Sequence, residues 1–208
     1  MIDSETSIED IYLGTKEVSE NLKFDQKKLQ EWIDANIQSS GKIKKVEQFK
    51  GGQSNPTYKI TTENNNLVLR RKPPGKLLPS AHAVDREYRV ITALSQTNVP
   101  VPKTYGLCED EDVVGTPFFV MDFLDGEVYW DHMLPKLSKE ERIKIYQKKN
   151  KVLAALHTVD YKKIGLETYG KPGNYVARQV SRWAKQYLAS ETETIPEMDN
   201  LIEWLADN

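Results

Sequence analysis

The residues best suited to chemistry lie within 67–94, where a basic cluster is followed by a helical pattern that carries carboxylates. A short apolar run ends in Arg70, Arg71 and Lys72, and Glu87 lies on the helix that follows. A base on a strand can neutralise phosphate oxygens when a carboxylate on a neighbouring helix fixes its position. The spacing therefore predicts a site for a phosphate-bearing ligand.

Two bases of this cluster could contact the phosphates. Side chains alternate along a strand, so Arg70 and Lys72 point to one face and Arg71 points to the other. An alternative is that the cluster is a charged sheet edge, which protects against aggregation. Glu87 also has an alternative, as a solvated surface charge of little energetic value. Asp85 lies roughly 200° around the helix from Glu87, so the two carboxylates cannot face the same base.

The hydrophobic pattern supplies the strands and helices that would position these residues. Apolar residues at helical spacing predict a first helix, with Asp25 as its N-cap and Gly41 as its stop. Three antiparallel strands follow at 43–50, 57–62 and 67–72, joined by a glycine turn and an Asn-rich turn.

Two prolines after residue 72 end the third strand, because proline cannot donate to a sheet ladder. A helix is predicted over 81–95, then a fourth strand up to Leu107, an acidic turn at 109–112 and a buried strand over 116–123. These elements make a compact α+β lobe, with five antiparallel strands and one helix inserted after the third.

The pattern is entirely helical after residue 125. Ser138 and Glu141 have the spacing of a capping box, which opens a helix that ends near His157. Two further helices are predicted at 175–189 and 197–206.

The composition excludes several classes of protein. The chain has 208 residues, of which 38% are hydrophobic and 29% charged, as is typical of a globular protein. A net charge of −2 argues against a nucleic-acid binder. No apolar run is long enough for a membrane span, and the N-terminus lacks the apolar core of a secretory signal. Cys108 is the only cysteine, which suits a reducing compartment. We therefore predict a cytoplasmic protein with no nucleic-acid or membrane partner.

The order of five short segments resembles the aminoglycoside phosphotransferase family, a branch of the protein-kinase-like fold that includes choline kinases. Among its branches, the chain looks most similar to the kinase-like domains linked to acyl-CoA dehydrogenases. The segments are LVLRRKPPG, VDRE, VPVPK, FFVMDFLDG and LHTVD. The resemblance implies ATP or GTP with Mg²⁺ and a small-molecule hydroxyl substrate. It also implies three regions: a flexible lead-in at 1–24, a nucleotide-binding N-lobe at 25–125 and the beginning of a helical substrate-side C-lobe at 126–208.

The resemblance assigns the loop over the nucleotide phosphates to Gly51, Gly52, Ser54 and Asn55. Glycines there would let backbone N–H groups approach the phosphates, and the two polar side chains could reach them as well. An ordinary hairpin turn would explain the same glycines.

The resemblance aligns Arg70 with the family's phosphate-binding lysine. The chain departs from the family pattern here, because a guanidinium is bulkier than an ammonium and directs its donors differently. Lys72, one pleat further along, could supply an ammonium instead. Glu87 aligns with the helix carboxylate that pairs with this base.

The resemblance places the hinge between the lobes at Met121, Asp122 and Phe123, whose backbone would recognise the adenine edge. The same apolar side chains would also serve as core. Arg178, on a later helix, could meet an anionic substrate group, although an amphipathic helix with an aromatic stripe explains this segment equally well.

The family's catalytic loop, H-G-D-x-x-x-x-N, is not in this sequence. The three histidines are followed by Ala83, Met133 and Thr158. We assign no catalytic or metal-binding residue, and we expect this chain to be the front portion of a longer phosphotransferase and not to be a competent kinase by itself. We also expect apolar surface on the last helices to be exposed, as a site of association.

Two other functions remain open. A catalytically inactive binding or regulatory module would explain both the arginine at position 70 and the missing loop. An antibiotic-resistance enzyme would need an acidic cleft for a polycationic drug, and we rank it below a metabolic kinase.

Overall fold

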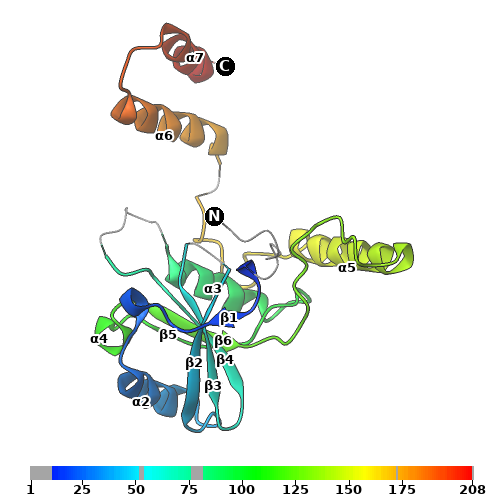
Figure 1. Cartoon of the computed structure of the whole chain (residues 1–208). Helices are drawn as coiled ribbons and strands as arrows, with labels where there is room; N and C mark the ends of the chain where they lie inside the picture. Colours follow the sequence, from blue (N-terminus) through cyan, green and yellow to red (C-terminus); the bar gives the residue numbers. More distant parts are fainter. Residues whose placement is uncertain (1–10, 52–53, 76–81, 172, 208) are drawn as a thin grey trace. The chain divides into compact units, whose positions relative to one another are not determined.

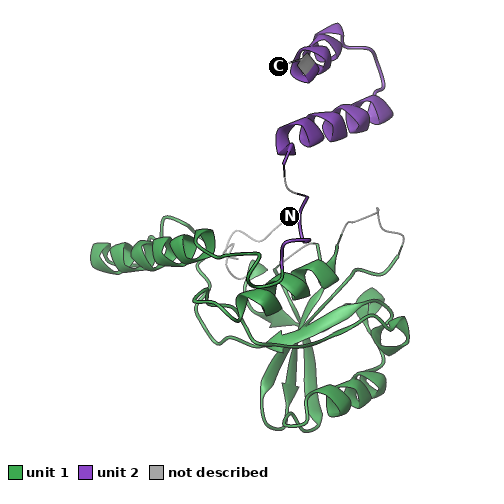
Figure 2. Ribbon diagram, turned by 180° about the vertical axis from the view of Figure 1, so that it is seen from behind, with its two compact units in different colours: residues 1–165 green, residues 166–208 purple. Residues whose placement is uncertain are grey.

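The computed structural model describes residues 11–51, 54–75, 82–171 and 173–207. The chain forms two compact units, residues 1–165 and 166–208 (Figure 2). The secondary-structure elements in chain order are β1 (Thr15–Lys16), η1 (Glu20–Leu22), α2 (Gln26–Asn36), β2 (Ile43–Phe49), β3 (Thr57–Thr62), β4 (Asn66–Arg71), α3 (Val84–Leu94), β5 (Thr104–Cys108), α4 (Glu111–Val114), β6 (Phe118–Asp122), α5 (Lys139–His157), α6 (Tyr175–Ser190) and α7 (Pro196–Asp207).

The first unit is built on one antiparallel sheet, with strand order β1-β2-β3-β4-β6-β5 (Figure 1). The predicted α+β class is confirmed, but the sheet has six strands where five were expected. The additional strand, β1, pairs Thr15 with Phe49 and Lys16 with Gln48 at the edge of β2. A two-residue strand is too short to show a period-2 pattern. It lies in the segment expected to be a flexible lead-in.

One face of the sheet carries the hydrophobic core. Asp25 caps α2 by accepting from the backbone N–H groups of Lys27 and Lys28, and the helix buries Leu29 and Ile33 against this face. The other members of the core cluster are Ile37, Tyr58, Ile60, Leu67, Leu69, Cys108, Val114, Phe118 and Val120.

The opposite face of the sheet carries α3. Residues paired across neighbouring strands share a face, so Thr57, Arg70 and Phe119 point to the same side. The Tyr88 ring of α3 lies 6.0 Å from the ring of Phe119. Trp32 of α2 lies 5.0 Å from the neighbouring Phe118, which points the other way. The two helices therefore cover opposite faces, and the charged residues of interest lie on the α3 side.

Arg71 lies in the core, at 2% exposure. Its Nε donates to the Tyr58 hydroxyl at 3.1 Å, and its Nη atoms donate to the carbonyl oxygens of Val114 and of Leu22, the latter at 2.7 Å. The rings of Phe24 and Tyr58 lie against the guanidinium. Arg71 thus ties η1, β3 and the end of α4 together.

Two predicted boundaries differ from the observed ones. The first helix ends at Asn36, before the expected stop at Gly41. The segment expected as an acidic turn contains the one-turn helix α4, which Asp110 caps and Gly115 ends in a left-handed conformation. One helical turn carries too few residues for a period to be visible.

The helices after β6 lie close to their predicted bounds. Ser138 and Glu141 form the predicted capping box at the start of α5. No residue of α5 is buried. In the second unit, α6 and α7 pack against each other through apolar residues. No helix in the described ranges is long and apolar enough to cross a membrane.

Candidate functional site

A cavity of about 540 Å³ lies on the α3 side of the sheet, within the first unit. Val68 of β4 and Met121 near the end of β6 line it, together with Phe123 and Gly51. Its volume is within the range of small-molecule sites. The cavity therefore brings the glycine-bearing loop together with the segment predicted as the hinge.

Arg70 and Glu87 form the predicted ion pair. The Nε of Arg70 donates to Glu87 Oε2 at 2.5 Å, and its Nη2 donates to Glu87 Oε1 at 3.2 Å. The two side chains are 28% and 33% exposed, so solvent partly screens the pair. A bidentate contact fixes the plane of the guanidinium as well as its position.

The remaining donors of Arg70 point toward the start of β3. Nη1 donates to the Thr57 hydroxyl at 2.9 Å and to the Asn55 carbonyl oxygen at 3.4 Å. Thr57 also lines the cavity, so it connects the ion pair with the ligand-sized space. An arginine has five N–H donors, and bonds within the described part of the chain use four of them.

The Asn55 side chain forms hydrogen bonds with Glu87 and His82. It is 4% exposed, and its Nδ2 donates to Glu87 Oε1 at 3.0 Å. A carboxylate only accepts, so the amide oxygen of Asn55 must face His82 Nδ1, at 2.9 Å. His82 therefore donates from Nδ1. The Asn55 side chain thus helps to position the ion pair, and its contact with a phosphate stays a prediction.

The predicted phosphate loop is described only in part. Gly52 lies outside the described residues, and Ser54 is exposed. A Cβ atom on Gly51 would lie 2.9 Å from the backbone oxygen of Tyr12, so the N-terminal segment requires a glycine at this position. The sequence analysis explained Gly51 by the approach of backbone N–H groups to a phosphate. The close contact with Tyr12 is a second reason why a glycine is needed at this position.

The predicted hinge lies against the cavity, with some of its backbone already paired. The N–H of Asp122 donates to the Lys103 oxygen at 2.8 Å, and that of Phe123 to the Asn66 oxygen at 3.4 Å. Leu124, the next residue, also lines the cavity. Recognition of a base edge by the backbone of Met121, Asp122 and Phe123 stays a prediction.

A side-chain bond reinforces the hinge. The hydroxyl of Tyr105 donates to Asp122 Oδ1 at 2.6 Å. This hydrogen bond to a carboxylate, helped by burial, raises the pKa of Tyr105 to about 12. The phenol therefore stays protonated and holds β5 to the end of β6.

Lys72 and Arg178 each form hydrogen bonds within their own unit. Lys72 follows the end of β4, and its carbonyl oxygen accepts from the Thr116 hydroxyl at 2.8 Å. Arg178 donates to the carbonyl oxygens of Gly173 and Lys171 in the loop before its own helix. The roles proposed for these two residues remain predictions.

The sequence analysis missed several residues that lie near the site. Lys59 pairs with Val68 across the sheet, and its Nζ lies 4.3 Å from the centre of the Phe123 ring. Strand alternation from Thr57 would have placed Lys59 on the same face. Tyr12 and Trp130 also line the cavity, but nothing in their local sequence indicates a site.

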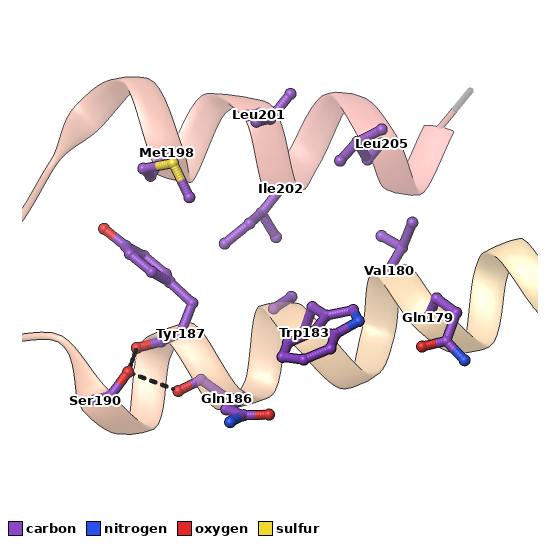
Figure 3. Close-up of a pocket in the computed structure, with 11 residues that line it drawn as sticks. Gln179, Val180, Trp183, Gln186, Tyr187, Ser190, Met198, Leu201, Ile202 and Leu205 are labelled. Atoms are coloured by element: carbon purple, nitrogen blue, oxygen red, sulfur yellow. Dashed lines mark hydrogen bonds between the residues drawn. The ribbon is translucent and has the colours of Figure 1, made fainter. Parts of the chain in front are cut away.

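A second cavity, also of about 540 Å³, lies between α6 and α7. Val180 and Tyr187 of α6 point toward α7, where Leu205 lies opposite Val180 and Met198 opposite Tyr187 (Figure 3). Its lining is mostly apolar and carries none of the residues predicted to bind nucleotide.

Within the described ranges, no three His, Cys, Asp or Glu side chains gather closely enough to hold a metal ion. Cys108 is buried in the core cluster, and burial raises the pKa of its thiol. A raised pKa makes a thiol less reactive at neutral pH, so Cys108 packs as a small apolar residue.

The antiparallel sheet, α3 and the Arg70–Glu87 pair together make a kinase-like phosphotransferase fold. A model of the phosphotransferase enzyme family matches residues 45–208, and the chain belongs to this family. The resemblance drawn from the five segments is thereby confirmed.

Known proteins similar to the chain are of two kinds. A crystal structure of a "putative aminoglycoside phosphotransferase" from Ralstonia eutropha is 50% identical, with a TM-score of 0.72, and the match covers 89% of this chain and 54% of that one. Acyl-CoA dehydrogenase family member 10 of Mus musculus is 44% identical over 200 residues, which are 94% of this chain and 19% of the relative. Acyl-CoA dehydrogenase family member 11 of Homo sapiens is 40% identical over 196 residues, which are 92% of this chain and 25% of the relative. The chain thus spans a quarter or less of these two relatives.

Proposed function

We propose that the first unit binds ATP or GTP, as the nucleotide-binding portion of a small-molecule O-phosphotransferase. One observation carries the proposal. A ligand-sized cavity lies between the glycine-bearing loop, β4 and the end of β6, and Thr57 links its lining to the Arg70–Glu87 pair. Membership of the phosphotransferase enzyme family supports the same assignment.

The parts of the cavity suit different parts of a nucleotide. Val68, Met121 and Phe123 offer apolar surface for a purine ring, and the backbone of 121–123 would recognise its edge. Arg70 would supply positive charge to the phosphates and has one N–H left to donate. Lys72 and Ser54 remain candidates for further phosphate contacts. Mg²⁺, bound with the nucleotide, would neutralise phosphate charge during transfer.

The acceptor in this proposal is a small metabolite with a hydroxyl group. The names of the relatives, acyl-CoA dehydrogenase family members, favour a hydroxyl-bearing acyl compound over a polycationic drug. A cytoplasmic location fits the single, buried cysteine.

Calorimetric titration with MgATP and MgGTP tests the nucleotide assignment. We expect saturable binding by the wild-type chain, and about tenfold weaker binding in Arg70→Ala and Glu87→Ala, because each loses a charge-assisted contact. Asp85→Ala is the matched control, since this exposed carboxylate lies on the same helix and should leave the affinity unchanged. No binding by the wild type at millimolar nucleotide would contradict the assignment.

The hydrogen bonds of Arg70 favour a second function, that of an inactive binding or regulatory module. Protein atoms take four of its five N–H groups, so the pair could serve structure alone in an inactive binding or regulatory module. An H-G-D-x-x-x-x-N sequence downstream in the same reading frame would decide for the enzyme. A downstream sequence without it would decide for the module.

A further inference from the structure

The segment before β2 forms part of the nucleotide cavity, although no motif marks it. We call residues 11–16 the N-terminal strap. Tyr12, Leu13 and Gly14 of the strap line the cavity, and so does Trp130, which follows the hinge by several residues. The cavity is thus bounded by chain regions far apart in the sequence.

An aromatic pair joins these two regions. The rings of Tyr12 and Trp130 stack with centroids 4.5 Å apart and planes 2° from parallel. Trp130 is 43% exposed, so the pair lies at the mouth of the cavity and not in the core. A stacked pair at a solvent-exposed mouth has a free ring surface that a bound ligand can cover.

The strap is tied to the strand edge beside the glycine-bearing loop. The backbone N–H of Lys50 donates to the Gly14 oxygen at 3.1 Å, and the hydroxyl of Thr15 donates to Glu47 Oε1 at 3.0 Å. Tyr12 lies so close to Gly51 that no side chain fits there. These contacts fix the backbone of the strap beside β2 and Gly51, and the Tyr12 ring packs against the ring of Trp130.

We propose that Tyr12 and Trp130 form an aromatic wall that packs against the nucleoside part of a bound purine nucleotide. The inference rests on the proposed function, because it names further residues of the same cavity. Val68 and Phe123 cover the cavity from the sheet side, and the aromatic wall covers it from the mouth. The wall contributes affinity for the nucleoside and none for the phosphates.

Binding of MgATP, adenosine and inorganic tripolyphosphate to single variants tests this wall. We expect Tyr12→Ala and Trp130→Ala each to weaken MgATP and adenosine binding by about 3- to 10-fold, since aromatic contacts add this much beyond buried area. Binding of tripolyphosphate should change less than twofold. Tyr12→Phe keeps the ring and should bind as the wild type does.

Two further variants make the test specific. Tyr12→Ala combined with Trp130→Ala should weaken binding by less than the product of the single effects, because the rings act as a pair. Tyr129→Ala is the matched control: Tyr129 adjoins Trp130 but lies against a neighbouring cavity, and its removal should leave the affinity unchanged.

The outcomes separate this inference from the proposed function. One outcome would overturn the aromatic wall and leave the proposed function intact. In it, the wild type binds MgATP and Arg70→Ala weakens this binding, but Tyr12→Ala and Trp130→Ala bind within twofold of the wild type. An equal loss for tripolyphosphate, or in Tyr129→Ala, also overturns the wall. If the wild type binds no nucleotide, both proposals fail together.

Discussion

Arg71 differs from its neighbour Arg70 in what it does for the molecule. Arg70 faces the cavity side and pairs with a carboxylate, whereas Arg71 lies in the core and donates to a phenol and two backbone oxygens. Strand alternation predicts that the side chains of Arg70 and Arg71 point to opposite faces. It does not predict that Arg71 is buried. Its partners on η1 and α4 are far away in the sequence.

Replacing Arg71 by methionine should destabilise the first unit strongly. The methionine retains the apolar stem, but the Val114 carbonyl oxygen loses its donor, and the Leu22 oxygen keeps only the Tyr58 hydroxyl. A buried polar group left without a partner costs about 1–3 kcal/mol, so we expect the free energy of unfolding to fall by about 2 kcal/mol. Chemical denaturation followed by circular dichroism measures it, with the exposed Lys44→Met as control. A change below about 1 kcal/mol would contradict this role of Arg71.

The hydrogen bond from Tyr105 to Asp122 should make stability depend on alkaline pH. The pKa of Tyr105 is raised to about 12 in the folded protein, from about 10 in an unfolded chain. Its contribution is therefore complete below about pH 10 and is lost as the pH rises toward 12. Denaturation of wild type and Tyr105→Phe at pH 8 and pH 11 measures it. The wild type should lose more stability between these two values than the variant, and equal losses would contradict the assignment.

At the scale of elements, long periodic segments were predictable and short ones were not. The helices α2, α3, α5, α6 and α7 and the strands β2 to β6 lie near their predicted positions, because each has enough residues to show a period. Contacts between segments that are distant in the chain could not be predicted from the sequence. The side chain of Asn55 could not be oriented from sequence, since Glu87 and His82 decide it, and nothing local identified the Tyr12–Trp130 pair.

Helix α5 should depend on its cap more than most helices do. None of its residues is buried, so local interactions replace packing as the source of its stability. Loss of an N-cap costs about 1 kcal/mol, and we expect Ser138→Ala to speed amide hydrogen exchange in the first turns of α5 by about fivefold. Lys139→Ala, one position along, serves as the control. Unchanged exchange in Ser138→Ala would show that contacts outside the helix hold it.

At the scale of the whole chain, the exposed apolar side chains of α5 predict self-association. Ile143, Tyr146, Leu153 and Leu156 lie on one side of the helix and are 44–49% exposed. Exposed apolar side chains of this kind favour association in water. We expect the sedimentation coefficient to rise with protein concentration in the wild type. The rise should be smaller in Leu153→Glu and unaltered in Gln147→Glu, and a wild type that sediments as a monomer at all concentrations would contradict the prediction.

The central claim is that the cavity beside β4 and the end of β6 holds a nucleotide. Amide chemical shifts of the isotopically labelled chain, recorded during a titration with MgATP, test it most directly because they report where the ligand binds. We predict saturable shifts that cluster at Gly51, Val68 and 121–124. Shifts confined to the cavity between α6 and α7, or no shifts at millimolar nucleotide, would contradict the claim.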